Sequence, residues 1–184
     1  MHLGIIHTKN MENTSALLEK LPPAASDLVI NAQRVLAGES LDAEQTWGTA
    51  LAAAYFIRHP ELTAAILADA KSSGLSAAAI ADAQGAAALM GMNTIYFRFR
   101  HLMKADAYSK LPFNLSMKRM QQVATTKENF ELFSIAPAAL AGCELCLQAH
   151  EAAVKKAGMS ETNVHDAARI ASVLHGIVVA LDII

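Results

Sequence analysis

Residues 131–150 read ELFSIAPAALAGCELCLQAH and contain both cysteines of the 184-residue chain, Cys143 and Cys146. Gly142 interrupts the apolar run before them, which predicts that a new helix begins close to Cys143. On such a helix, Cys143 and Cys146 stand at positions i and i+3, and His150 follows Cys146 at i+4. All three side chains therefore share one face, with an imidazole beside a pair of thiols.

This spacing suits redox chemistry. Two thiols three residues apart can close a disulfide with little backbone motion. A helix N-terminus and a nearby imidazole both favour the thiolate, which is the reactive form.

Two other uses of the pair remain open. A zinc site would take Cys143, Cys146 and His150 and need His165 or His175 as a fourth ligand, and two buried cysteines can also serve as small core residues.

Glu131 lies twelve residues before Cys143, with apolar residues on both sides. A carboxylate in such surroundings is costly to bury unless it has a partner. By itself the pattern favours an exposed glutamate near the start of an amphipathic helix, where the helix dipole stabilises it. A role for Glu131 beside the thiols is the alternative.

Three separate sequence blocks, in order, resemble the AhpD-like alkylhydroperoxidases of the carboxymuconolactone decarboxylase superfamily over about residues 40–180. The blocks are Glu44-Gln-Thr-Trp-Gly-Thr49, Ala86-Ala-Ala-Leu-Met-Gly-Met-Asn93 with Tyr96 and Arg98, and Asn129-Phe-Glu-Leu132 followed by Cys-x-x-Cys-x-x-x-His-Glu. The resemblance implies an all-α fold built from two related helical halves. It also implies an antioxidant thiol peroxidase that reduces organic hydroperoxides.

The resemblance assigns four catalytic residues. Cys146 would be the peroxidatic thiol that becomes a sulfenic acid, and Cys143 the resolving thiol that closes the disulfide. Glu131 and His150 would relay protons. The chain departs from the family pattern at Leu145, where the family often has histidine, so one proton carrier is missing. We expect activity to persist with an altered rate or pH dependence.

The resemblance also implies partners. It implies no bound cofactor or metal but an external reductant, dihydrolipoamide carried by a lipoyl-bearing acyltransferase, and a peroxiredoxin that receives electrons. It further implies a homotrimer or a larger homo-oligomer such as a hexamer. Rival functions are a disulfide reductase or adaptor that passes electrons to a peroxiredoxin, and a redox sensor. A decarboxylase is disfavoured because the thiol pair would have no evident part in it.

The composition and net charge limit the kinds of partner that the chain is expected to bind. The chain is 53% hydrophobic but only 5% aromatic, as expected for closely packed helices rich in small aliphatic residues. A net charge of −2 predicts neither a nucleic acid nor a membrane partner. The N-terminus lacks the pattern of a secretory signal, and no run of 18 apolar residues is uninterrupted, so we expect a cytoplasmic protein.

The length predicts one domain spanning residues 1–184. When the sequence is aligned with itself so that His59 falls on Cys143, Leu62 falls on Cys146 and Gly74 falls on Gly158. We interpret this as an internal repeat of about residues 40–100 and 125–184, of which only the second copy carries thiols. Expected helices are a short one after the capping residues 13–15, then about 25–36, 42–59, 60–73, 76–101 and 115–123, with the 76–101 helix at the centre.

Overall fold

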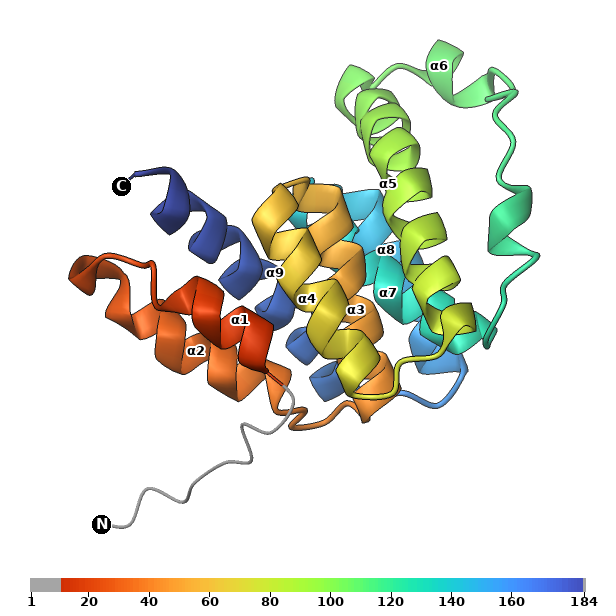
Figure 1. The fold of residues 1–184 in the computed structure, drawn as a ribbon. Helices are drawn as coiled ribbons and strands as arrows, with labels where there is room; N and C mark the ends of the chain where they lie inside the picture. Colours follow the sequence, from red (N-terminus) through yellow and green to blue (C-terminus); the bar gives the residue numbers. More distant parts are fainter. Residues whose placement is uncertain (1–10, 184) are drawn as a thin grey trace.

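The computed structural model describes residues 11–183, which form nine α-helices and two short 3-10 helices, with no strand (Figure 1). The all-α fold class is confirmed. The α-helices are α1 (Glu12–Leu18), α2 (Ser26–Leu36), α3 (Ala43–Ile57), α4 (Pro60–Ser72), α5 (Ala77–Met103), α6 (Asp106–Lys110), α7 (Lys127–Leu140), α8 (Glu144–Lys156) and α9 (Glu161–Asp182). The 3-10 helices are η1 (Pro23–Ala25) and η2 (Lys118–Met120). Residues 1–10, on which part of the localisation prediction rests, lie outside the described residues.

Helices α3 and α7 form the centre of the fold, and α5 and α9 each pack against both. Helix α4 covers α3, α8 covers α7, α1 packs on α4, and α2 packs on α9. The two central helices approach closely where Gly48 faces the ring of Phe133, since a Cβ at Gly48 would lie 2.1 Å from the Cζ atom of that ring. Only glycine fits at this crossing.

The helix bounds in the structure match each other when the chain is aligned with itself so that His59 falls on Cys143. Helices α4 and α8 match at both ends, and the first residues of α3 and α5 fall on the first residues of α7 and α9. The N-caps match as well, because the Ser76 and Ser160 side chains both accept a hydrogen bond from the backbone of the following helix. These matching bounds support the internal-repeat interpretation, which stays a prediction about domain organisation.

Two expected helices differ from the structure. Helix α1 begins at Glu12, because the carboxylate of Asp69 accepts hydrogen bonds from the backbone N–H groups of Asn13 and Thr14 and so replaces a local cap. The helix expected over residues 115–123 is wrong, since only the η2 turn forms there. This segment is instead held by contacts between its side chains and the bundle.

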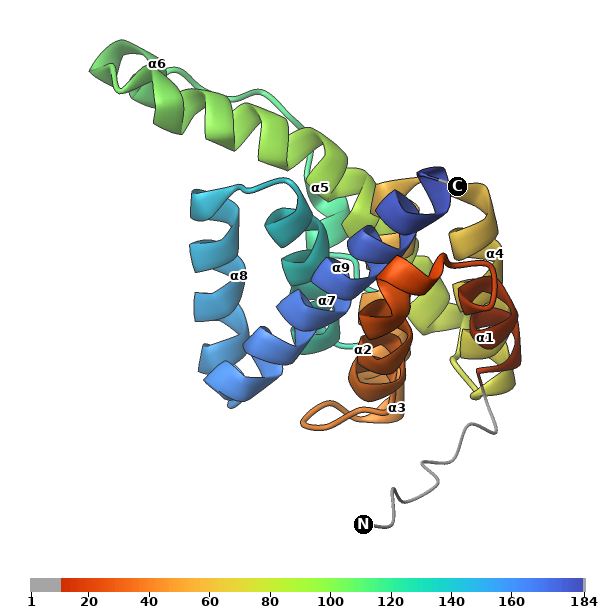
Figure 2. The same cartoon turned by 90° about the vertical axis from the view of Figure 1, so that its left-hand side faces the viewer.

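Helix α5 was expected to be central and buried, but only its first two thirds are. Its buried residues end at Thr94, and its C-terminal part extends beyond the bundle with α6 at its tip (Figure 2). Exposed apolar residues lie on this extension and just after it: Ile95, Phe99, Leu102, Met103, Leu111 and Phe113. The all-round apolar sequence of this helix therefore does not correspond to all-round burial within one chain.

Among the described residues, one helix, α9, is long and apolar enough to cross a membrane by length and composition. In the fold, its Ile170, Leu174 and Ile177 are fully buried, and it contacts α2, α3 and α7. Core helices of compact proteins meet the same criteria.

Two buried aspartates connect segments that lie far apart in the chain. Asp82 on α5 accepts hydrogen bonds from the backbone N–H groups of Ala124 and Thr125 and from the Thr125 hydroxyl, and it pairs with Arg119 at 2.5 Å. Burial alone would raise the pKa of Asp82, but these hydrogen bonds and the Arg119 charge outweigh it and lower the pKa. Asp166 on α9 binds the Ser40 N–H and hydroxyl ahead of α3 in the same way, and its pKa is also lowered.

We expect Asp82→Asn to lower the free energy of unfolding at pH 7 by about 2 kcal/mol, the range for hydrogen bonds to a charged group. The folded-state pKa of Asp82 is below its usual 3.8, so this stabilisation is present above pH 3.8 and is lost as the pH falls through the folded-state value. The difference between wild type and variant, measured by urea unfolding, should therefore shrink in acid. Asp27→Asn on the exposed side of α2 is the control, and equal effects of the two substitutions would contradict the prediction.

Candidate active site

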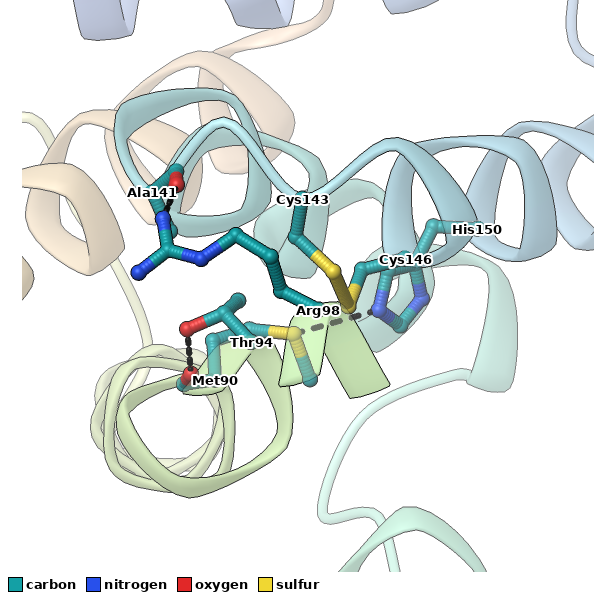
Figure 3. Close-up of a disulfide and its surroundings, with 7 residues drawn as sticks. All are labelled: Met90, Thr94, Arg98, Ala141, Cys143, Cys146 and His150. Carbon is teal, nitrogen blue, oxygen red and sulfur yellow. Dashed lines mark hydrogen bonds between the residues drawn. A yellow bond between two sulfur atoms is a disulfide. The ribbon is translucent and has the colours of Figure 1, made fainter. Parts of the chain in front are cut away.

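The two cysteines lie where α7 turns into α8. Gly142 has φ of +62°, the left-handed conformation that favours glycine, and Cys143 is the N-cap of α8. Cys146 follows in the first turn and forms a disulfide with Cys143, with their Cα atoms 5.3 Å apart (Figure 3). The predicted helix start and the predicted reach between the thiols are confirmed. Arg98 of α5 donates a hydrogen bond to the carbonyl of Ala141 and so joins α5 to this turn.

Glu131 and His150 form a buried pair beside the disulfide. Their side chains are 2.6 Å apart, from His150 Nδ1 to Glu131 Oε2, and His150 is only 4% and Glu131 only 6% exposed. The exposed position favoured by the local pattern around Glu131 is therefore wrong. A buried carboxylate needs a partner, and α7 and α8 lie against each other so that His150 supplies it.

The hydrogen bond to the carboxylate orients the imidazole. With Nδ1–H donating to Glu131, Nε2 is the nitrogen able to exchange a proton with its surroundings. Nε2 lies 3.2 Å from the Sδ atom of Met90 on α5. Figure 3 shows the His150 ring beside the Cys146 end of the disulfide, with Met90 across from both. The arrangement places an oriented imidazole beside Cys146.

A pocket of about 430 Å³ opens onto this group. Its lining combines residues of α5, α7 and α8 with the segment between α6 and α7: Met90, Asn93, Phe97, Met117, Met120, Gln121, Lys127, Glu131, Leu145, Cys146, Ala149 and His150. Most of its surface is apolar. Cys146 lines this pocket, whereas Cys143 is completely buried behind it against Met90 and Ala138. A molecule in the pocket therefore meets Cys146.

Leu145, which stands where the family often has histidine, is 39% exposed at the pocket mouth. Its neighbour Glu144 points elsewhere, because it pairs with His101 of α5 at 3.4 Å and accepts a hydrogen bond from Gln148. Neither residue replaces the missing imidazole.

The residues of the zinc alternative do not come together. His165 and His175 lie on α9, both exposed, and His165 is 3.9 Å from Asp166. Across residues 11–183, no group of three or more His, Cys, Asp or Glu side chains is arranged to hold a metal ion.

Several pocket residues were not predicted as site residues from sequence. Asn93 and Met90 face the site from α5, and Met117 and Met120 reach it from the η2 segment. Asn93 did carry a signal, since it is a polar residue in a helix otherwise rich in Ala and Met. Met117 and Met120 carried none, because residues 115–123 were expected only to form a short helix, with nothing in the sequence to place it against the site.

Comparisons with known proteins show the family of this chain. Residues 107–183, which include both cysteines and His150, match the carboxymuconolactone decarboxylase family. The chain is 47% identical over 172 residues to the alkyl hydroperoxide reductase AhpD of Anaeromyxobacter sp. (strain Fw109-5), covering 94% of this chain and 92% of that protein. It is 42% identical to the protein of the same name from Rhodospirillum centenum, covering 91% and 89%, and 40% identical to that from Maricaulis maris, covering 90% and 95%. The chain therefore belongs to the AhpD family, within the wider carboxymuconolactone decarboxylase family.

Proposed function

We propose that this chain is an alkyl hydroperoxide reductase that uses Cys146 and Cys143 as a redox pair with a Glu131–His150 proton relay. The observation that carries the proposal is that Cys146, and not Cys143, lines an apolar pocket together with a carboxylate-oriented imidazole. The relatives that the chain matches over most of its length are named for this activity.

The first step begins in the reduced enzyme. His150 Nε2 accepts the proton of the Cys146 thiol, and Glu131 stabilises the resulting imidazolium through the bond to Nδ1. The first turn of α8 also favours the thiolate. The thiolate attacks the terminal oxygen of the hydroperoxide, so an S–O bond forms and the O–O bond breaks. His150 returns its proton to the departing alkoxide, which leaves as an alcohol.

The second step regenerates a disulfide. Cys143 attacks the Cys146 sulfenic acid, and water leaves as the Cys143–Cys146 disulfide forms. The 5.3 Å between the two Cα atoms suits this bond, so the step needs little backbone motion. The buried Cys143 is shielded from peroxide and is suited to the resolving role.

An external dithiol then reduces the disulfide. We propose dihydrolipoamide on an acyltransferase as that reductant and a peroxiredoxin as an electron acceptor, with no bound cofactor and a cytoplasmic location. The exposed apolar residues on the α5 extension, such as Ile95 and Leu102 at 65% exposure each, support a homo-oligomer, for which we propose a trimer or a hexamer.

Leu145 favours a second candidate function, a disulfide reductase that serves a peroxiredoxin and reacts poorly with peroxide itself. Without the imidazole at this position, fewer groups can protonate a leaving alkoxide. Comparing peroxide consumption by the chain alone with consumption after a peroxiredoxin is added distinguishes the two functions.

The two cysteine substitutions should have different outcomes. Cys146→Ser should leave the protein inert to tert-butyl hydroperoxide, because the remaining thiol is buried outside the pocket. Cys143→Ser should react once and stop at a sulfenic acid on residue 146, because no resolving thiol is present. Mass spectrometry after dimedone trapping checks both. A sulfenic acid on residue 143 in the Cys146→Ser protein would reverse the assigned roles.

Glu131→Gln keeps the size of the side chain but removes its charge. We expect the rate of Cys146 oxidation by tert-butyl hydroperoxide to fall about 100-fold, the lower end of the range for general acid–base catalysis. Stopped-flow measurement of thiol loss gives the rate. Glu128→Gln, an exposed carboxylate in the first turn of the same helix, should leave it unchanged. Equal rates in wild type and Glu131→Gln would remove Glu131 from the relay.

Leu145→His should raise peroxide turnover severalfold near pH 7, because an imidazole at the pocket mouth can both accept and donate a proton in that range. Leu145→Gln is the matched control, since it adds a polar side chain that does not titrate. If the two variants behave alike, polarity rather than proton transfer limits the wild type.

A further inference from the structure

Asn93 is buried with an unpaired side-chain oxygen, which lowers the stability of the fold. It is 3% exposed, and its Oδ1 atom has no hydrogen-bond partner. Leaving a buried acceptor unsatisfied is unfavourable, so such groups call for an explanation. Four buried side-chain atoms are unpartnered among residues 11–183, and Asn93 Oδ1 is the only one whose residue lines the pocket beside Cys146.

Asn93 belongs to the wall that α5 contributes to the pocket. It lies one helical turn after Met90 and one before Phe97 on α5, and all three line the pocket. Figure 3 shows Met90 of this helix reaching toward the disulfide. Among the other polar side chains of the lining, Gln121 and Lys127 are exposed, and the Glu131 carboxylate already binds His150.

The alignment of the chain with itself shows whether helix packing alone requires an amide at the position of Asn93. In the alignment of the two halves, the site residues Glu131, Cys146, His150, Met90 and Asn93 correspond to Trp47, Leu62, Ile66, Leu174 and Ile177. All five counterparts are apolar and buried. At the position of Asn93, therefore, the other half packs with a fully buried isoleucine, and helix packing does not require an amide. Asn93 thus resembles Glu131, Cys146 and His150, the residues of the proposed chemistry, in having an apolar and buried counterpart.

We propose that the Asn93 carboxamide binds the hydroperoxide group of the substrate, an inference that rests on the proposed peroxidase function. Oδ1 accepts a hydrogen bond from the O–H of the terminal oxygen and presents that oxygen to the Cys146 thiolate. Nδ2 donates to the second oxygen. As the S–O bond forms and the O–O bond breaks, the electron pair moves onto this second oxygen, where the Nδ2 bond strengthens until His150 delivers the proton.

The test uses Asn93→Leu, which has a similar volume and removes the unsatisfied amide. We expect the second-order rate of thiol oxidation by tert-butyl hydroperoxide to fall about tenfold, or about 1.4 kcal/mol. Reaction of the thiols with methyl methanethiosulfonate, which has no O–H to donate, should keep its wild-type rate. The melting temperature should rise by about 2–4 °C because a buried unpaired group is gone. A purely structural asparagine would give the opposite change in stability.

Two further variants make the result decisive. Asn93→Ala leaves more space in the pocket and must show the same selective loss, which separates hydrogen bonding from obstruction by leucine. Thr14→Val removes another buried, unpartnered oxygen far from the pocket, on α1, and should keep the wild-type peroxide rate.

Three results would overturn the proposal. The first is an unchanged peroxide rate in both Asn93 variants. The second is an equal loss of both thiol reactions, which would mean that Asn93 acts on the thiol rather than on the peroxide. The third is wild-type protein whose thiols survive excess peroxide, in which case the proposed function itself fails.

Discussion

The buried carboxylate of Asp82 organises the part of the fold on which the candidate site depends. It accepts the backbone N–H groups of Ala124 and Thr125, just ahead of α7, and pairs with Arg119. The first contact holds the residues just before Thr126, the N-cap of the helix that carries Glu131. The second holds the η2 segment, whose methionines line the pocket. A single ionised group therefore connects α5, the pocket wall and the helix of the proposed relay, and it can do so because several hydrogen bonds compensate its burial.

Helices α3, α4 and α5 begin at positions that match the starts of α7, α8 and α9 when the chain is aligned with itself, but the matching residues differ in chemistry. In the first half, positions that correspond to the thiol, imidazole and carboxylate hold leucine, isoleucine and tryptophan, all buried. The second half replaces them with polar groups that must find partners in the interior. Glu131 and His150 satisfy each other, whereas Asn93, which lines the same pocket from α5 of the first half, keeps an unpaired Oδ1. Stability is thus given up at the site between α5, α7 and α8, whereas the matching positions on α3, α4 and α9 form an ordinary apolar core.

Most of the fold could be predicted because its signals are local. The capping residues Asp42 and Ser76 and the breaks at Pro60 and Gly142 predict helix ends that the structure has within a few residues. The helix over 115–123 could not be rejected from sequence, because long-range contacts hold that segment, above all Arg119 with Asp82. The start of α1 was missed for the same reason, since Asp69 lies far along the chain from the N–H groups it binds.

The helical class and the spacing of Cys143, Cys146 and His150 along the start of α8 follow from local sequence alone, because residues within two turns of one helix have a fixed geometry. Only the tertiary structure decided that Glu131 is buried against His150, that Cys146 rather than Cys143 lines the pocket, and that Asn93 faces it. These facts depend on how α5, α7 and α8 pack. Helix packing places together residues far apart in the chain, and no local pattern specifies which of them will meet.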